Sequence, residues 1–132
     1  MKIPVGRQLY YYRARVRNVY DGDTFRADVD LGMNVRTSWK GQSFRLSVID
    51  TPEIRGDQRE DGLIVRDYVR DLILDKDIII NTEQSGSFGR WLAWVFIENS
   101  DVLDPRETLN EHLLKIGYAV YWGDEWPGLP EK

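Results

Sequence analysis

The clearest pattern in the chain is YRARVRNVYDGDTFRADVDL, at residues 12–31. Apolar side chains at Ala14 and Val16 alternate with arginines, and a second alternation of apolar and charged residues runs from Phe25 to Leu31. A period of two is typical of a β-strand with one buried face. The Asp-Gly-Asp between the two runs, at residues 21–23, has the chemistry of a tight turn. This stretch therefore predicts a β-hairpin.

The rest of the chain divides in the same way. We expect a third strand at 44–49, ended by Pro52; a helix at about 59–75; strands at 78–80 and 91–97; a helix from the N-cap candidate Thr108 to Gly117; an extended segment at 118–122; and a frayed tail at about 123–132. Five short strands with a helix after the third are typical of a small closed barrel of the OB type. The expected fold is therefore mainly β with α, a single domain over residues 1–132: a five-stranded OB-type Greek-key barrel with two packed helices, one after the third strand and one near the C-terminus.

The composition excludes several kinds of catalytic and metal-binding site. The 132 residues include no cysteine and one histidine, His112. Disulfides, zinc–thiolate sites and cysteine nucleophiles are therefore excluded, and so are metal sites built from several histidines. The net charge of −4 argues against a protein that is held on DNA by bulk electrostatics.

The apolar residues are scattered along the chain. No apolar run approaches the ~18 residues that cross a bilayer. The first residues lack the apolar core of a secretory signal. We therefore expect a monomer with no membrane partner and a cytoplasmic location, and a phage or prophage origin is compatible with both.

Three carboxylates stand at the ends of strand patterns. Asp23 lies in the predicted turn, and Asp50 and Glu53 flank Thr51-Pro52 after the third strand. If the second and third strands run side by side, these groups converge at one end of the barrel. Oxygen ligands without His or Cys favour a hard cation such as calcium or magnesium. The alternative for residues 21–23 is a plain hairpin turn, because Asp-Gly is a common turn dipeptide.

Two arginines complete the set of candidate site residues. Arg45 lies on the predicted third strand and Arg90 follows Gly89 at a turn. A guanidinium is planar, permanently charged and matches phosphate oxygens in pairs. The alternative for either arginine is a solvated or ion-paired surface residue. The stripe of arginines on the first strand, at residues 13, 15 and 17, leaves the same choice between a phosphate-binding surface and a solvated face.

Several separated blocks, taken together, point to one family. They are DGDT at 21–24, RLSVIDTPE at 45–53, GRWLA at 89–93, LNE at 109–111 and GYA at 117–119. In this order and spacing, from about residue 16 to residue 122, the chain resembles the thermonuclease (staphylococcal nuclease) family. The resemblance implies an OB barrel with packed helices. It also implies calcium-dependent hydrolysis of DNA or RNA, in which the P–O5′ bond is cut and a 3′-phosphate end is left.

The resemblance also assigns roles around the metal ion. One calcium ion would be bound by the carboxylates of Asp23 and Asp50 and by the backbone carbonyl of Thr51. Asp21 would lie beside these ligands without binding the ion itself. Glu53 would be the general base, or would orient the attacking water.

The remaining implied roles concern the substrate, for which a single-stranded DNA or an RNA is favoured. Arg45 and Arg90 would clamp the scissile phosphate and stabilise the charge on its oxygens in the transition state. Phe88 stands where the family usually has a tyrosine, so one hydroxyl that would reach a nucleotide phosphate is missing. Tyr121 is a candidate for stacking on a base, as are its neighbours Trp122 and Trp126, with packing as the alternative role.

Two other functions stay open at this stage. The first is a catalytically weak or inactive domain of the same fold that binds nucleic acid or protein. The second is a structural calcium-binding module. The carboxylates and arginines that the resemblance assigns are all present, whereas the family's lysine-rich loop after Glu53 is not reproduced.

Overall fold

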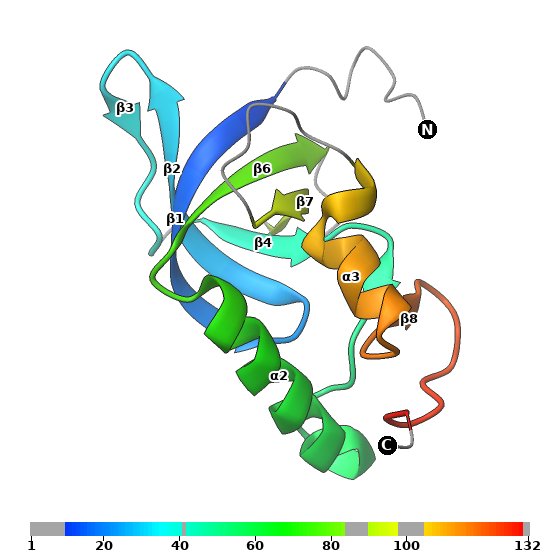
Figure 1. The fold of residues 1–132 in the computed structure, drawn as a ribbon. Coiled ribbons are helices and arrows are strands. Elements are labelled where there is room, and N and C mark those ends of the chain that lie inside the picture. The colour runs from blue at the N-terminus through cyan, green and yellow to red at the C-terminus, as the bar shows by residue number, and fades with distance from the viewer. Residues whose placement is uncertain (1–9, 41, 84–89, 98–104, 131–132) are drawn as a thin grey trace.

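The computed structural model describes residues 10–40, 42–83, 90–97 and 105–130 and places a closed barrel at their centre (Figure 1). Its five strands are β1(Tyr11–Asp21), β2(Thr24–Gly32), β4(Ser43–Leu46), β6(Asp77–Glu83) and β7(Arg90–Phe96). The sheet order is β1-β6-β7-β4-β2, and an additional β1–β2 pairing closes it. The short strand β3(Val35–Arg36) pairs with the end of β2, outside the barrel. The expectation of a five-stranded OB-type barrel with two helices is therefore confirmed.

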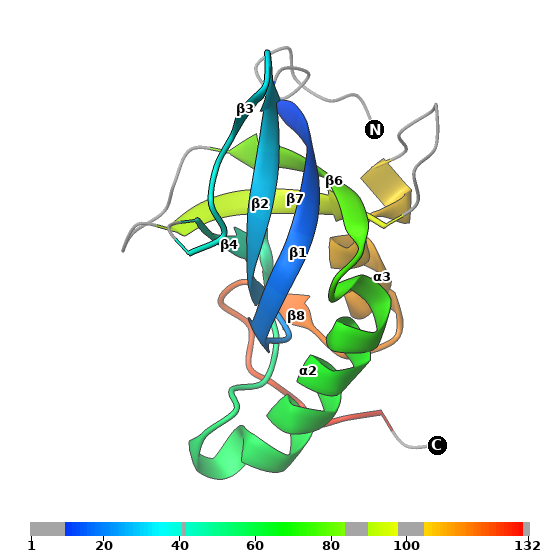
Figure 2. The ribbon, with the colours of Figure 1, turned by 90° about the vertical axis from the view of Figure 1, so that its left-hand side faces the viewer.

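The hairpin of β1 and β2 follows the alternation in the sequence. Val16 pairs with Ala27, and both side chains are fully buried. Asp21 pairs with Thr24, so that the turn consists of Gly22 and Asp23. Figure 2 shows this hairpin crossing the front of the barrel, with the helix α2(Arg59–Ile73) beyond one end. The turn thus lies at the rim of the barrel, where Gly22 and Asp23 are both buried.

The predicted third strand is not continuous. β4 stops at Leu46, and a separate strand, β5(Ile49–Asp50), pairs with β8(Val120–Tyr121) near the C-terminus. Val48 between them has a φ of +62°, in the left-handed region that β-branched residues avoid. In a regular strand, residues 45 and 50 would point to opposite faces. The left-handed residue turns the chain, and this turn brings their side chains together.

Ser47 holds this turn in place. Its N–H donates to the carbonyl of Ala93 at 2.9 Å, and its own carbonyl accepts from Nδ2 of Asn110 at 3.0 Å. Its hydroxyl donates to the carboxylate of Glu83 at 3.2 Å. Ser47 and Asn110 are completely buried. Because every one of these polar groups has a partner, the turn is a fixed part of the barrel wall.

The two α-helices pack where the sequence predicted. α2(Arg59–Ile73) buries Val65, Val69 and Ile73 against the barrel. α3(Leu109–Lys115) begins after Thr108, whose hydroxyl accepts from the N–H of Glu111 at 3.2 Å, as the capping pattern predicted. Two 3₁₀ turns, η1(Gly56–Gln58) and η2(Pro105–Glu107), precede them. Within the described residues, no helix is long and apolar enough to cross a membrane.

The segment after β8 has no regular secondary structure but does make contacts. Nε1 of Trp126 donates to the carboxylate of Asp61 on α2 at 3.2 Å. A side chain added at Gly117 would lie 3.2 Å from the ring of Pro130, which places the end of the segment against the residue that follows α3. The expectation of a frayed tail did not include these contacts.

Candidate functional site

The turn of the β1–β2 hairpin and the strand that follows β4 meet through Asp23. This carboxylate is 7% exposed and accepts from the N–H of Thr51 at 3.2 Å. The backbone carbonyl of Asp23 accepts from the N–H of Leu46 at 2.8 Å. Nη2 of Arg45 lies 3.7 Å from Oδ2 of Asp23. The structure therefore brings one predicted ligand, one predicted clamp and the Thr51 backbone to the same end of the barrel.

Arg45 is anchored through one nitrogen. Nη2 donates to Oδ1 of Asp50 and, at 3.4 Å, to the carbonyl of Ile49. The guanidinium carbon lies 5.0 Å from the centre of the Trp122 ring. With a side chain only 15% exposed, Arg45 is a partly buried cation with a carboxylate at one edge and an indole on one face. Such a cation is not a solvated surface residue.

Asp21 adds negative charge that the cation does not balance. Its carboxylate accepts from the N–H of Asp23 at 3.1 Å, so the two carboxyl groups are neighbours. Burial raises the pKa of Asp21 to about 7, and repulsion by the charge of Asp23 adds to the effect. Two crowded carboxyl groups of this kind are stabilised by a cation, which would lower that pKa again.

The oxygen donors fit a hard cation, with one adjustment. Within the described ranges, no three His, Cys, Asp or Glu side chains already form a metal-binding group. Asp23 supplies one carboxylate, with that of Asp21 beside it, whereas the carboxylate of Asp50 is bound to Arg45. The hydroxyl of Thr51 is buried and has no hydrogen-bond partner among the described residues. The set therefore fits a calcium or magnesium ion if Asp50 turns from Arg45 towards Asp23.

Glu53 lies on the other side of Thr51-Pro52 and is exposed. Its N–H donates to Oε1 of Gln58 at 3.1 Å, and its carboxylate has no partner among the residues that the structure describes. Its backbone lies so close to α2 that a Cβ at Gly62 would be 2.1 Å from its carbonyl oxygen. Glu53 is thus fixed through its backbone, and its side chain is free to meet water and substrate.

Arg90 shares a face of the sheet with Arg45. It pairs with Ser43, and Arg45 pairs with Leu92, so the two arginines stand two residues apart on adjacent parallel strands. Paired residues of neighbouring strands point to the same side of a sheet. The side chain of Arg90 is half-buried. The two expected clamps therefore come from one face, although no contact joins them within the described residues.

The structure describes one of the two residues that were expected to contact the substrate. Phe88 lies outside the described residues. Tyr121, on β8 opposite Ile49, is 57% exposed. It therefore stands at the rim of the site, with its ring accessible.

The structure gives three residues a role that the sequence did not predict: Trp122, a candidate for base stacking or packing, and the glycines Gly22 and Gly62. Trp122 covers Arg45, and Gly22 and Gly62 allow backbone segments to approach closely. A Cβ at Gly22 would lie 2.6 Å from Val65 and 2.8 Å from the Thr51 hydroxyl. Both glycines can be read in the sequence, but they are required because a side chain would not fit there, rather than because of the turn geometry. The contact of Trp122 depends on strand pairing between distant parts of the chain, which no local pattern reveals.

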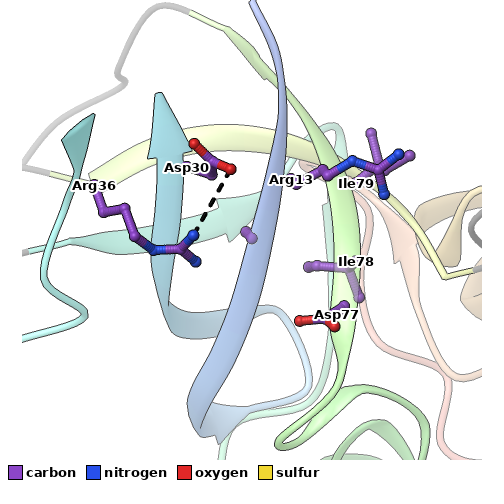
Figure 3. A pocket seen from close by; sticks show the side chains of 7 residues that line it. Arg13, Asp30, Arg36, Asp77, Ile78 and Ile79 are labelled. Carbon is purple, nitrogen blue, oxygen red and sulfur yellow. Dashed lines mark ion pairs between the residues drawn. The ribbon is translucent and has the colours of Figure 1, made fainter. Parts of the chain in front are cut away.

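The arginine stripe on β1 is an ion-paired surface. Arg17 pairs with Asp28 at 2.9 Å and Arg15 with Asp77 at 3.3 Å. A cavity of about 210 Å³ beside them is lined by both signs of charge, and Figure 3 shows its pair of Arg36 and Asp30 at 3.7 Å. Two of the three arginines are therefore paired with aspartates, which favours a solvated face over a track for phosphates.

The fold and the site together define a class: a small OB-barrel protein with carboxylates and arginines gathered at one end of the barrel. The sequence model of the Staphylococcal nuclease homologue family matches residues 43–127, and the chain belongs to this family. The match includes Arg45, Asp50, Glu53 and Arg90 but not Asp23. Its members are generally nucleases.

The chain has a relative among curated proteins. The uncharacterized protein MJ1439 of Methanocaldococcus jannaschii is 30% identical over an alignment that covers 83% of this chain and 58% of the relative. The chain therefore spans less than two thirds of that protein's length.

Proposed function

We propose that the protein is a calcium-dependent nuclease that hydrolyses phosphodiester bonds of DNA or RNA. The observation that carries the proposal is the meeting of Asp23, Arg45 and Asp50 at one end of an OB barrel, with Nη2 of Arg45 between the two carboxylates. Phosphodiester hydrolysis requires positive groups that neutralise charge on the phosphoryl oxygens and a base that accepts a proton from water. Both kinds of group are present here.

Each residue of the site has a part in the reaction. Asp23, Asp50 and the Thr51 carbonyl would hold the ion, with Asp21 beside them, and the bound ion would supply charge neutralisation at the phosphate. Glu53 accepts a proton from the attacking water. The water oxygen then bonds to phosphorus as the P–O5′ bond breaks. The 5′-oxygen leaves as an alkoxide that takes a proton from water, and the phosphate stays on the 3′-oxygen.

The arginines act on the same phosphate from one face of the sheet. Within the described residues, Nη1 and Nε of Arg45 have no protein partner, so the N–H groups of both nitrogens are available to phosphoryl oxygens. Arg90 comes from the adjacent strand and reaches the same face. Two guanidinium groups whose charge does not depend on pH suit a reaction in which negative charge develops on oxygen. A single-stranded nucleic acid is the favoured substrate, since the exposed Tyr121 offers its ring to an unpaired base.

A second candidate is a domain of the same fold that binds nucleic acid with little or no catalysis. The arrangement of Asp50 favours it, because that carboxylate is bound to Arg45 and does not face Asp23. In such a domain the Arg45–Asp50 pair would persist when the ligand is bound. Cleavage would then be weak whatever the metal concentration.

The test is a cleavage assay on single-stranded DNA and RNA with calcium, with magnesium and with EDTA. We expect calcium-stimulated cleavage that EDTA abolishes. Glu53→Gln should reduce the turnover number by roughly 10²- to 10⁴-fold while calcium affinity, measured by calorimetry, stays the same. Glu60→Gln, at an exposed residue in the first turn of α2, is the matched control and should keep full activity. Wild-type protein that binds single strands but cleaves none under calcium would support the second candidate.

A further inference from the structure

Trp122 has an unusual combination of a fixed backbone and an exposed side chain. Its N–H donates to the carbonyl of Val48 at 2.9 Å. It directly follows β8, which pairs with the strand that carries Asp50. Even so, the residue is 58% exposed. An indole held at the surface in this way gains little free energy from burial, so burial does not explain why it is held there.

The contact that this indole makes is with Arg45. The ring centre lies 5.0 Å from the guanidinium carbon, within the range of a cation–π interaction. All side-chain hydrogen bonds of Arg45 in the described structure go through Nη2. These bonds hold one corner of the guanidinium and leave the tilt of its plane less constrained. A flat ring against its face limits this tilt and fixes the directions of the N–H groups on Nη1 and Nε.

We infer that Trp122 is a positioning residue for Arg45: the indole fixes the guanidinium plane, and with it the directions in which the N–H groups of Nη1 and Nε meet the phosphate. This inference rests on the proposed nuclease function, because the phosphate is the group that Arg45 would bind. A second consequence concerns what holds Arg45 when Asp50 binds a metal ion. If Asp50 turns towards a metal ion, Arg45 loses a hydrogen bond from Nη2, and the indole becomes the main contact that keeps the guanidinium in place.

Two substitutions separate the effect of the aromatic face from that of side-chain size. Trp122→Leu keeps an apolar side chain but removes the π face, whereas Trp122→Phe keeps a smaller π face. A cation–π contact at a partly exposed site corresponds to roughly a fivefold change in rate. We therefore expect Trp122→Leu to lower the turnover number about fivefold with little change in KM for a short single-stranded oligonucleotide. Trp122→Phe should recover most of the loss.

A readout that does not need activity tests the contact itself. The Hε resonance of Arg45, assigned by its loss in Arg45→Lys, should be shifted upfield by the ring current in wild type and in Trp122→Phe. In Trp122→Leu this shift should disappear. Trp39→Leu is the control, because Trp39 lies between β3 and β4 and its N–H bonds to Asp28 on the solvated side of the barrel. It should change neither the resonance nor the rate, and circular dichroism should show that every variant is folded.

The outcomes separate this inference from the proposed function. Wild-type protein without calcium-stimulated cleavage would refute the nuclease proposal, and the resonance would then decide whether the indole positions Arg45. If wild type cleaves and Trp122→Leu turns over as fast, or if Trp122→Phe loses as much as Trp122→Leu, the positioning role is wrong. An Arg45 resonance that does not move in Trp122→Leu overturns it as well.

Discussion

Two parts of the site are held in contrasting ways. Arg45 is only 15% exposed at its side chain, with Asp50 at one edge and Trp122 on one face. Glu53 is exposed, and its carboxylate has no partner among the described residues. We call Asp23, Arg45 and Asp50 the buried arm of the site, and the strands of the barrel hold it. We call Glu53 the exposed arm, and the contact of its backbone with α2 holds it.

The contrast matches what each arm has to do. A clamp must already point at the phosphate, because reorientation during the reaction would cost free energy. A base must reach the attacking water and return its proton to solvent, and an exposed carboxylate can do both. The arms should therefore respond differently to substitution: changes in the buried arm alter charge and metal affinity, and changes near the exposed arm alter position.

Removal of the Arg45 side chain should have the largest effect on turnover of any change to the buried arm. We expect Arg45→Ala to lower turnover by roughly 10²- to 10³-fold, because a charged donor to the transition state is lost. The same change frees Asp50 from its ion pair, so calcium should bind more tightly, as calorimetry would show. Glu53→Gln, in contrast, should leave calcium affinity unchanged. Equal calcium affinity in Arg45→Ala and wild type would mean that Asp50 is not a ligand.

Gly62→Ala tests how the exposed arm is held. The new Cβ would lie 2.1 Å from the carbonyl oxygen and 2.5 Å from the carbonyl carbon of Glu53. Backbone atoms cannot rotate away, so α2 or the Glu53 backbone must shift. We expect a loss of about 1–3 kcal/mol in the free energy of unfolding and, since small misplacements of catalytic groups are costly, a turnover about 100-fold lower. Urea unfolding and cleavage rates measure the two effects.

A matched glycine substitution perturbs the turn of the buried arm. At Gly22 the new Cβ would meet the side chains of Val65 and Thr51 at 2.6–2.9 Å. Side chains can rotate, so Gly22→Ala should destabilise the fold by about 1 kcal/mol, less than Gly62→Ala. Its effect on calcium affinity should be the larger of the two, because Thr51 bonds to Asp23. A stability order in which Gly22→Ala is the worse variant would contradict this account.

The sequence predicted the exposed arm's surroundings better than the buried arm's. The barrel strands followed from a period of two, and α2 and the Thr108 cap followed from local signals. The buried arm depends on contacts between distant segments: β5 pairs with β8, and Asn110 on α3 bonds to Ser47. The family resemblance indicated which residues gather there. It did not indicate that Asp50 would be bound to Arg45 or that Trp122 would cover the guanidinium.

The left-handed Val48 was the least predictable feature, because a β-branched residue in an apolar run normally continues a strand. With Cβ present, a left-handed conformation costs about 1–2 kcal/mol. Alanine keeps that strain, whereas glycine removes it. We therefore expect Val48→Gly to be more stable than Val48→Ala by roughly 0.5–1 kcal/mol, the reverse of the order in a regular strand. Thermal unfolding of the two variants would measure this smallest of the expected effects. If Val48→Ala is the more stable, strain at Val48 does not hold the turn that joins Arg45 to Asp50.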